Sequence, residues 1–200
     1  MSTIAKSSII HPNVELGENC TIEDNCIIGV PGKGSSDGKK TILGKNSHIR
    51  AGSIIYAGNQ IGDNFQTGNR VNIRENNQIG SNVSIGTGSV IEHQIVIEDD
   101  VRIHSLCFVP EFSKIHSGAW IGPSVVLTNA KYPNQSDTKD NLVGPTIGSG
   151  ARIGANSTIL PGVKIGAGSF IGAASLVSKD VPDNKLAFGH PAKIQETSRS

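Results

Sequence analysis

Aliphatic side chains recur at every sixth residue along most of this chain, and this period limits the possible folds more than any other feature. The spacing runs over residues 4–28, 43–127 and 147–177. Of the 26 leading positions in these segments, 25 hold Ile, Leu or Val, and Thr67 is the exception. A period of six does not match an α-helix, which turns once in 3.6 residues. The spacing therefore favours a repeat of short strands.

Each group of six residues, or hexad, predicts one short strand followed by a tight corner. The fifth residue is small or aliphatic in most hexads, and Gly often follows the leading residue. Neighbouring strands stack at about 4.8 Å, so inward side chains form ladders. Repeats of this kind bury their apolar side only against one another, as in a solenoid. A narrow core explains why aromatic residues make up only 4% of the chain.

Three thiols and one threonine hydroxyl are among the side chains at positions that should face this core. Cys20, Cys26 and Cys107 all occupy the fifth position of a hexad, so we expect them to be small buried core residues. Thr67 occupies a leading position. A buried hydroxyl without a partner costs about 1–3 kcal/mol, so we expect that of Thr67 to bond a backbone carbonyl or a water inside the solenoid.

Three segments give the repeat a family resemblance. Residues 119–122 (AWIG), 159–166 (ILPGVKIG) and 177–193 (VSKDVPDNKLAFGHPAK) are similar to the signatures of the hexapeptide-repeat acyltransferases. The resemblance implies an all-β fold, a left-handed parallel β-helix with three hexads in each coil. A left-handed coil is unusual, because connections between parallel strands of one sheet are nearly always right-handed. Because the repeat also occurs in proteins that are not enzymes, function has to be argued from the site.

We expect a single domain over residues 1–200, with coils over about 4–182. Two loops interrupt the spacing, at about 30–41 and 128–145, and a short C-terminal tail covers 183–200. The second loop adds 14 residues to the regular step. A solenoid that loops out once in mid-body is usually building a site. In the enzymes that this chain resembles, such a loop reaches over the active site of the neighbouring subunit, which implies a homotrimer with sites between subunits.

Three hexads in a coil place residues 18 apart on top of one another. Beside the 128–145 loop, the third position of successive hexads reads Glu75, His93, Glu111 and Asn129. His93 should therefore lie between two carboxylates, each about 4.8 Å away along the stack. A carboxylate beside an imidazole fixes its tautomer, and such a His can accept a proton from an attacking amine or hydroxyl. We take His93 as the candidate catalytic base, oriented by Glu75 and Glu111, with Asn129 as a substrate contact.

A closer resemblance covers residues 61–80 and 84–93, which are similar to enzymes that acylate amino sugars attached to nucleotides. It implies acetyl-CoA as donor and direct attack on the thioester, since no Cys or G-x-S-x-G Ser offers a nucleophile. Relatives often carry His where this chain has Asn69. Arg74 suits a substrate phosphate, or it could bridge Glu92, 18 residues on. The candidate substrate-binding residues besides Asn129 are Asn69, Arg74, Glu92 and Tyr132.

The acyl donor is expected to lie along a groove between two subunits. His93 and Lys179 share one column, four coils or about 19 Å apart, which suits an extended pantetheine arm. Lysines near the last coils would attract its phosphates, and small residues would let the arm approach the backbone. Trp120 occupies an outward position that suits a subunit contact or the acyl carrier. The candidate cofactor-binding residues are Trp120, Ala155, Ala173, Ala174, Lys179 and Lys193.

Composition adds limits on partners and compartment. The chain has 18 Lys and Arg against 17 Asp and Glu, a net charge of +1, which gives no reason to expect nucleic acid or an anionic membrane as partner. No apolar run approaches the ~20 residues of a membrane span, and the N-terminus has no signal-peptide pattern. Three Cys without metal-ligand spacing favour a reducing cytoplasm and no metal cofactor.

Three alternatives remain open from the sequence. A sugar hydroxyl could replace the amine as acceptor, because the same base serves both. A gamma-class carbonic anhydrase shares the solenoid but needs three His converging on zinc, whereas His93, His104 and His116 should lie on three different sides of the coil. A non-catalytic trimeric scaffold would have no need for a loop beside the Glu–His–Glu column.

Overall fold

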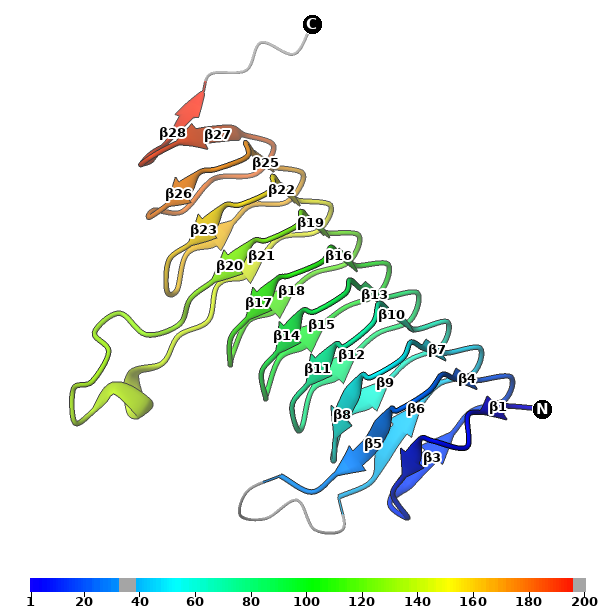
Figure 1. The fold of residues 1–200 in the computed structure, drawn as a ribbon. Coiled ribbons are helices and arrows are strands. Elements are labelled where there is room, and N and C mark those ends of the chain that lie inside the picture. Colours follow the sequence, from blue (N-terminus) through cyan, green and yellow to red (C-terminus); the bar gives the residue numbers. More distant parts are fainter. Residues whose placement is uncertain (33–38, 196–200) are drawn as a thin grey trace, which may run out of the picture.

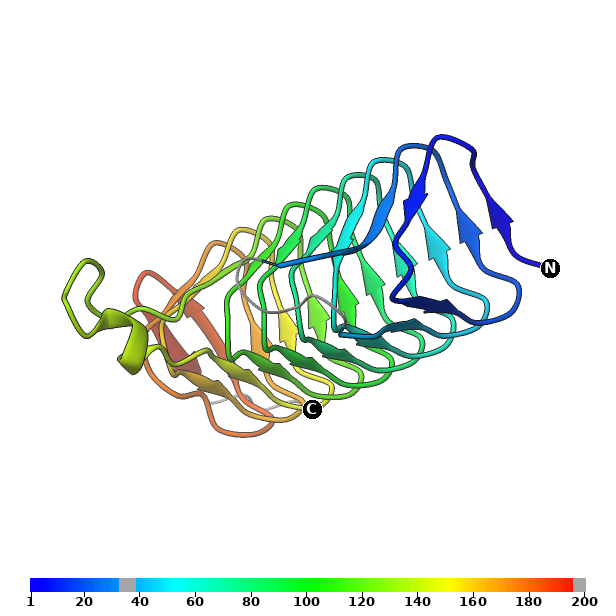
Figure 2. The same ribbon diagram turned by 90° about the horizontal axis from the view of Figure 1, so that it is seen from below.

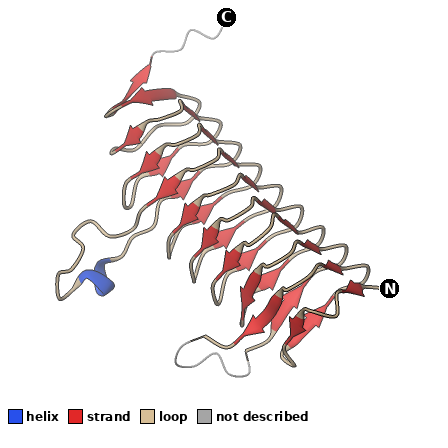
Figure 3. Ribbon diagram, viewed as in Figure 1, coloured by secondary structure: helices blue, strands red, loops and turns tan. Residues whose placement is uncertain are grey.

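The computed structural model describes residues 1–32 and 39–195, which form a parallel β-solenoid of about ten coils (Figure 1). Short strands separated by tight corners make up each coil, and the coils stack along one axis (Figure 2). Within the described residues, the only helical segment is the 3-10 helix η1 (Thr138–Asn141) (Figure 3). The all-β, left-handed parallel β-helix expected from the sequence is confirmed. No helix in this part of the chain is long and apolar enough to cross a membrane.

Three sheets, here called A, B and C, form the sides of the solenoid. Sheet A contains β1 (Thr3–Ile4), β4 (Thr21–Ile22), β7 (His48–Ile49), β10 (Gln66–Thr67), β13 (Ser84–Ile85), β16 (Arg102–Ile103), β19 (Trp120–Ile121), β22 (Arg152–Ile153), β25 (Phe170–Ile171), β27 (Leu186–Gly189) and β28 (Ala192–Gln195). Sheet B contains β2 (Ile9–Ile10), β5 (Ile27–Val30), β8 (Ile54–Tyr56), β11 (Asn72–Ile73), β14 (Val90–Ile91), β17 (Phe108–Val109), β20 (Val126–Leu127), β23 (Thr158–Ile159) and β26 (Leu176–Val177). Sheet C contains β3 (Val14–Leu16), β6 (Thr41–Leu43), β9 (Gln60–Ile61), β12 (Gln78–Ile79), β15 (Val96–Ile97), β18 (Lys114–Ile115), β21 (Thr146–Ile147) and β24 (Lys164–Ile165).

The strand register confirms that residues 18 apart stack on one another. Ile73 pairs with Ile91, and Ile91 pairs with Val109. The register also survives the long insertion, because Leu127 pairs with Ile159. Two rows of corners matter below: the A–B edge leads from sheet A into sheet B, and the B–C edge leads from sheet B into sheet C.

The core consists of the leading and fifth residues of the hexads. Nearly every leading residue from Ile22 onward is buried, whereas Ile4 in the first coil is largely exposed. Cys20, Cys26 and Cys107 are buried and unpaired, as expected, and burial raises the pKa of the Cys26 and Cys107 thiols. These thiols therefore act as small core side chains.

Thr67 departs from the expectation in its choice of partner. Its hydroxyl accepts a hydrogen bond of 2.9 Å from the backbone N–H of Arg50. One coil below on sheet A, the equivalent N–H of Glu23 donates to the carbonyl of Ile49 instead. The hydroxyl of Thr67 thus replaces a backbone carbonyl in the ladder, so its backbone partner is an N–H group rather than the expected carbonyl.

Glycine after the leading residue lets successive coils approach closely. A Cβ atom added to Gly68 would lie 2.3 Å from the backbone nitrogen of Thr87, and one added to Gly86 would lie 2.3 Å from that of Ser105. Rows of corners in which larger residues predominate also occur, and even the A–B edge holds Arg50 and His104 at this position. The B–C edge is one such row, since it carries Arg74 and Glu92 there.

The chain leaves the solenoid after β20 and returns to it at β21, and this excursion projects from the body (Figure 1). The start and end of the loop are joined by a hydrogen bond from the N–H of Val143 to the carbonyl of Asn129, 2.9 Å. The loop therefore leaves and re-enters at the same corner, on the B–C edge.

The two other irregular segments are only partly described. Of the expected loop at about 30–41, residues 33–38 lie outside the described residues, as do residues 196–200 of the expected tail. The rest of the tail is more regular than expected. β27 pairs in parallel with β25 and in antiparallel with β28, so sheet A continues through most of it.

Candidate active site

The predicted site residues divide between two edges of the solenoid and one loop. The register places the predicted base, both predicted orienting carboxylates and Lys179 on the B–C edge, together with Arg74, Glu92 and Asn129. Residues of the A–B edge follow sheet A and belong to another corner. They are Asn69, Ala155, Ala173 and Ala174.

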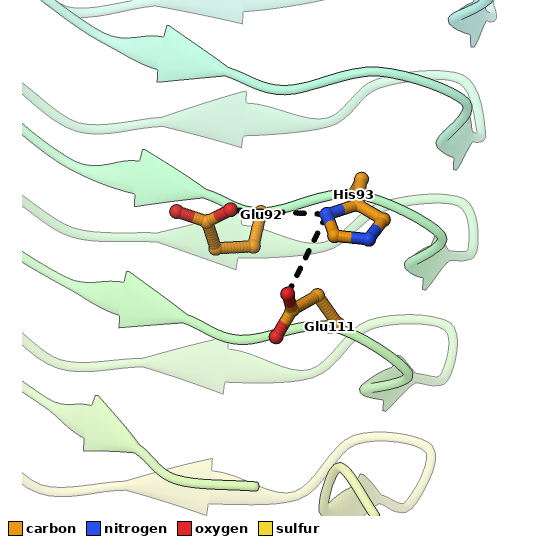
Figure 4. A group of neighbouring side chains, drawn as sticks. All are labelled: Glu92, His93 and Glu111. Carbon is orange, nitrogen blue, oxygen red and sulfur yellow. Dashed lines mark ion pairs between the residues drawn. The ribbon is translucent and has the colours of Figure 1, made fainter. Parts of the chain in front are cut away.

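His93 follows β14 and lies beside two carboxylates on the B–C edge (Figure 4). Its Nδ1 atom is 3.6 Å from Oε1 of Glu111 and 3.9 Å from Oε2 of Glu92. Nδ1 is buried and makes no hydrogen bond to a described residue. Nε2 lies on the other side of the ring (Figure 4) and makes no polar contact within the described residues. With Nδ1 protonated toward the carboxylates, Nε2 is free to accept a proton.

Glu75 does not take the place beside His93 that the sequence predicted for it. Nε and Nη2 of Arg74 donate to its two oxygens at 2.9 and 3.2 Å. Burial acts to raise the pKa of the Glu75 carboxyl, but these hydrogen bonds and the charges of Arg74 and His93 outweigh it and hold that pKa below its usual value. A bidentate guanidinium is the stronger partner, so Glu92 rather than Glu75 flanks the imidazole.

Arg74 links this cluster to its surroundings. Nη1 of Arg74 is 3.7 Å from Oε2 of Glu92, so the predicted bridge between them is present. Its guanidinium also lies over the ring of Tyr56, 5.0 Å from the centroid. The hydrogen bonds and charge of Glu75 raise the pKa of Arg74. These contacts occupy the guanidinium, which argues against its predicted use as a free phosphate ligand.

Glu111 is held from the side of the long loop. Nδ2 of Asn129 donates to its Oε2 at 2.6 Å, and Asn129 also closes the neck of the loop through its carbonyl. Gly144, at the returning end of the loop, packs so closely that an added Cβ would lie 2.7 Å from the carbonyl oxygen of Glu111. The sequence assigned Asn129 to substrate, but in the structure it orients the carboxylate that faces His93.

Tyr132 lies in the loop itself and is 59% exposed. The Nζ atom of Lys131 lies 5.4 Å from the centroid of its ring. These two residues and η1 line a hollow of about 410 Å³ within the loop. Because the loop projects from the body (Figure 1), Tyr132 is available to a ligand or subunit beside the solenoid.

The predicted acyl-CoA residues do not form one surface of a single chain. Lys179 lies in the His93 column as expected. Lys193 lies in β28, on the hairpin that ends sheet A, and the alanines lie on the A–B edge. Trp120 is on the outer face of sheet A, where its ring is 4.7 Å from that of His104. The predicted residues thus divide between the His93 column, the A–B edge and sheet A, and the donor groove expected between two subunits stays a prediction.

A zinc site of the carbonic-anhydrase kind is not assembled within the described chain. His93 follows sheet B, His104 follows sheet A and His116 follows sheet C, on three different sides as expected. The cluster that offers ligand atoms close together is Glu92, His93 and Glu111, whose atoms lie within 4.8 Å of one another. This group could hold a cation as well as a proton.

Sequence reasoning missed three residues near these sites. Tyr56 stacks on Arg74 one coil away, which the 18-residue column could have shown. Arg50 and Arg102 both lie on the outer face of sheet A, where they line a groove. Their positions in the hexads were also visible in the sequence.

Comparison with known protein families supports the repeat. Residues 144–179 match the family described as "Bacterial transferase hexapeptide (six repeats)". This segment contains β21 to β26, the regular coils that follow the loop. The resemblance to the hexapeptide-repeat transferases is thus confirmed.

Two curated relatives match part of the chain. Galactoside O-acetyltransferase from Lactococcus lactis is 36% identical over 78 residues, 37% of this chain and 38% of that protein. dTDP-3-amino-3,6-dideoxy-alpha-D-galactopyranose 3-N-acetyltransferase from Aneurinibacillus thermoaerophilus is 48% identical over 46 residues, 23% of this chain and 24% of that protein. The chain therefore spans well under half of the length of either relative.

A solved structure matches the fold over almost the whole chain. UDP-N-acetylglucosamine acyltransferase from Campylobacter jejuni aligns with a TM-score of 0.78 and 19% sequence identity, covering 96% of this chain and 74% of that one. At this identity the match shows a shared β-helix and nothing finer.

Proposed function

We propose that this chain is an acetyl-CoA-dependent acetyltransferase that acts on the amino group of a nucleotide-linked amino sugar. The observation that carries the proposal is the state of His93. Its Nδ1 faces Glu92 and Glu111, while Nε2 has no partner among the described residues. A His oriented in this way beside the neck of a projecting loop suits general-base catalysis.

In the proposed reaction, the amine nitrogen attacks the thioester carbonyl of acetyl-CoA. Nε2 of His93 removes a proton from the amine as the C–N bond forms, and the C–S bond then breaks to release the CoA thiolate. The proton on His93 passes to that thiolate, so the base is restored. Glu92 and Glu111 stabilise the positive charge that the imidazole carries between these steps.

The separation of the two edges favours a site shared between subunits. A ligand that touches both the B–C edge and the A–B edge of one chain would have to cross a full side of the triangle. In a homotrimer, the B–C edge of one subunit can face the A–B edge of the next, which brings His93 toward Asn69 and Ala155 of a neighbour. The buried unpaired thiols suit a reducing cytoplasm for this assembly.

A sugar hydroxyl is the second candidate acceptor, since the same base can deprotonate it. Relatives of both kinds match part of the chain, the O-acetyltransferase over 37% of it and the N-acetyltransferase over 23%. The amine is preferred because the sequence around His93 resembles the amino-sugar branch.

The test is a turnover assay with purified protein, acetyl-CoA and a panel of nucleotide-linked amino sugars, each matched by the sugar that carries a hydroxyl in place of the amine. We expect CoA release and an N-acetyl product with at least one amine. An O-acetyl product alone would overturn the amine assignment. Absence of CoA release with every acceptor would overturn the transferase assignment.

A further inference from the structure

A hollow of about 230 Å³ lies on the outer face of sheet A, close to the A–B edge and separate from the His93 cluster. An adjoining hollow of about 290 Å³ shares Gln66, Ser84 and Arg102 with it. We call the first hollow the polar groove. The residues that matter to its chemistry are Arg50, Ser84, Thr87, Arg102, His104 and Ser105.

The floor of the polar groove combines backbone with short or polar side chains, among them Gln66 and Ser84. Arg50, Gly68, Gly86 and His104 occupy the same hexad position in four successive coils. The two glycines therefore leave this one position without a side chain over two coils, or about 10 Å at about 4.8 Å per coil. Close packing of the corners requires these glycines, because an added Cβ at either would meet the backbone of the next coil.

The charge on the side chains that line the groove is positive. Arg50 and Arg102 are exposed and make no hydrogen bond or ion pair with the side chains that the structure describes. A carboxylate near enough to interact with Arg50 is that of Glu23, but its oxygens accept from Nε2 of His48 at 2.7 Å and from the N–H of Ala51 at 3.1 Å. No Asp or Glu is among the described residues that line the groove.

Neutral donors also line the polar groove. The hydroxyls of Ser84 and Ser105 make no hydrogen bond to the described chain, and that of Thr87 accepts from the N–H of Asn69, which leaves its proton free to donate. The backbone amides of Thr87 and Ser105 are also without an acceptor in the described chain. At another corner, the matching N–H of Ser81 donates to Asp99. The groove is thus rich in donors and poor in acceptors.

We propose that the polar groove binds a diphosphate group carried by one of the two substrates. Guanidinium forks suit phosphoryl oxygens, and free hydroxyl and amide protons complete their coordination. Arg50 and Arg102 lie about three coils, or ~14 Å, apart along the stack. Their long side chains can both reach a ligand with two linked phosphoryl groups, whereas a single carboxylate is too small to contact both. The identity of the carrier rests on the proposed function, because both a nucleotide-linked sugar and acyl-CoA contain a diphosphate.

The direct test is calorimetric titration of the purified protein with inorganic pyrophosphate. Arg50→Gln and Arg102→Gln should each weaken binding about tenfold or more, since a charge-assisted hydrogen bond is lost. Arg152→Gln is the matched control, because Arg152 is an exposed sheet A residue at the same hexad position as Arg102 and does not line the groove. It should bind as the unaltered protein does. Undetectable binding to the unaltered protein, or equal affinities in all variants, would overturn the proposal.

Kinetics then distinguish the carrier. If the groove holds the nucleotide, both arginine variants raise KM for the nucleotide-linked amino sugar about tenfold and leave KM for acetyl-CoA unchanged; the reverse pattern assigns it to CoA. An unchanged KM for both substrates would overturn the assignment to a substrate. If pyrophosphate binding depends on the arginines but the protein acetylates no acceptor, the diphosphate site stands and the proposed function is rejected. Titration with UDP and with CoA would then identify the molecule that carries the diphosphate.

Discussion

Nδ1 of His93 lies 3.6 Å from Oε1 of Glu111, and the opposite oxygen of that carboxylate accepts a 2.6 Å hydrogen bond from Asn129. The carboxylate is therefore fixed from the loop side and directed at the imidazole. A few tenths of an ångström separate this contact from a hydrogen bond. Protonation of His93 would supply the attraction that closes it.

Glu111→Gln should lower kcat roughly 10–100-fold, because it removes a charged partner worth about 1.5–3 kcal/mol to the protonated imidazole. The glutamine has the same shape as Glu111, and its amide oxygen can still accept the hydrogen bond from Asn129. Glu98→Gln is the matched control. Oε1 of Glu98 lies 2.9 Å from Nδ1 of His116, and these two residues are 18 apart, as Glu111 and His93 are, but they follow sheet C. Equal activity of the two variants in steady-state assays would contradict the role of Glu111.

Thr67→Val should lower the melting temperature by several degrees. The variant leaves the N–H of Arg50 without the hydroxyl that accepts its 2.9 Å hydrogen bond, at a cost of about 1–3 kcal/mol, and each kcal/mol is about 2–4 °C in a chain of this size. Ile85→Val, one coil further in the same column, controls for small changes in core packing. An unaltered melting temperature would mean that Arg50 shifts to the ordinary carbonyl partner.

Glu75→Gln should destabilise the protein at neutral pH but not in acid. The pKa of Glu75 is lowered in the folded state, so its ionised form adds stability above its unfolded value of about 4.3. This stability is lost as pH falls through the folded pKa. Thermal melts from pH ~7 to ~3 should show the gap between variant and unaltered protein closing below about pH 4. A gap of constant size would contradict the Arg74–Glu75 account.

Lys179→Ala should raise KM for acetyl-CoA several-fold and leave KM for the sugar nearly unchanged. Lys179 is exposed at the end of the His93 column, where an extended pantetheine arm would place phosphates. Lys114→Ala separates this from a general loss of surface charge, because Lys114 is an exposed residue of sheet C outside the candidate sites. A rise in the sugar KM instead would show that the acyl donor runs in the opposite direction.

The fold could be predicted almost entirely from the sequence, since one period determines both the strands and their stacking. The step of 18 even predicted the pairing of Leu127 with Ile159 across the long loop. The C-terminal hairpin was missed because β27 and β28 do not follow the hexad rule. Its strands are joined by local antiparallel pairing, which the six-residue spacing does not encode.

The site was predicted less well, for two physical reasons. The column placed Glu75 and Glu111 alike around His93, but side-chain direction depends on local partners, and Arg74 takes both oxygens of Glu75. Ala155 was grouped with His93 by residue type although their columns differ by one corner. Arg50 and Arg102 were overlooked because neither carries a motif, and only their shared hollow relates them.

The central claim is that His93 is the catalytic base, and the measurement that tests it is the acetyl-transfer rate of His93→Ala. We expect kcat to fall by roughly 10²–10⁴, the usual contribution of general-base catalysis, with the fold and oligomeric state unchanged. His116→Ala, which removes a His with a carboxylate partner on another sheet, should retain normal turnover. Near-normal turnover of a correctly folded His93→Ala protein would contradict the account and leave the CoA thiolate as the proton acceptor.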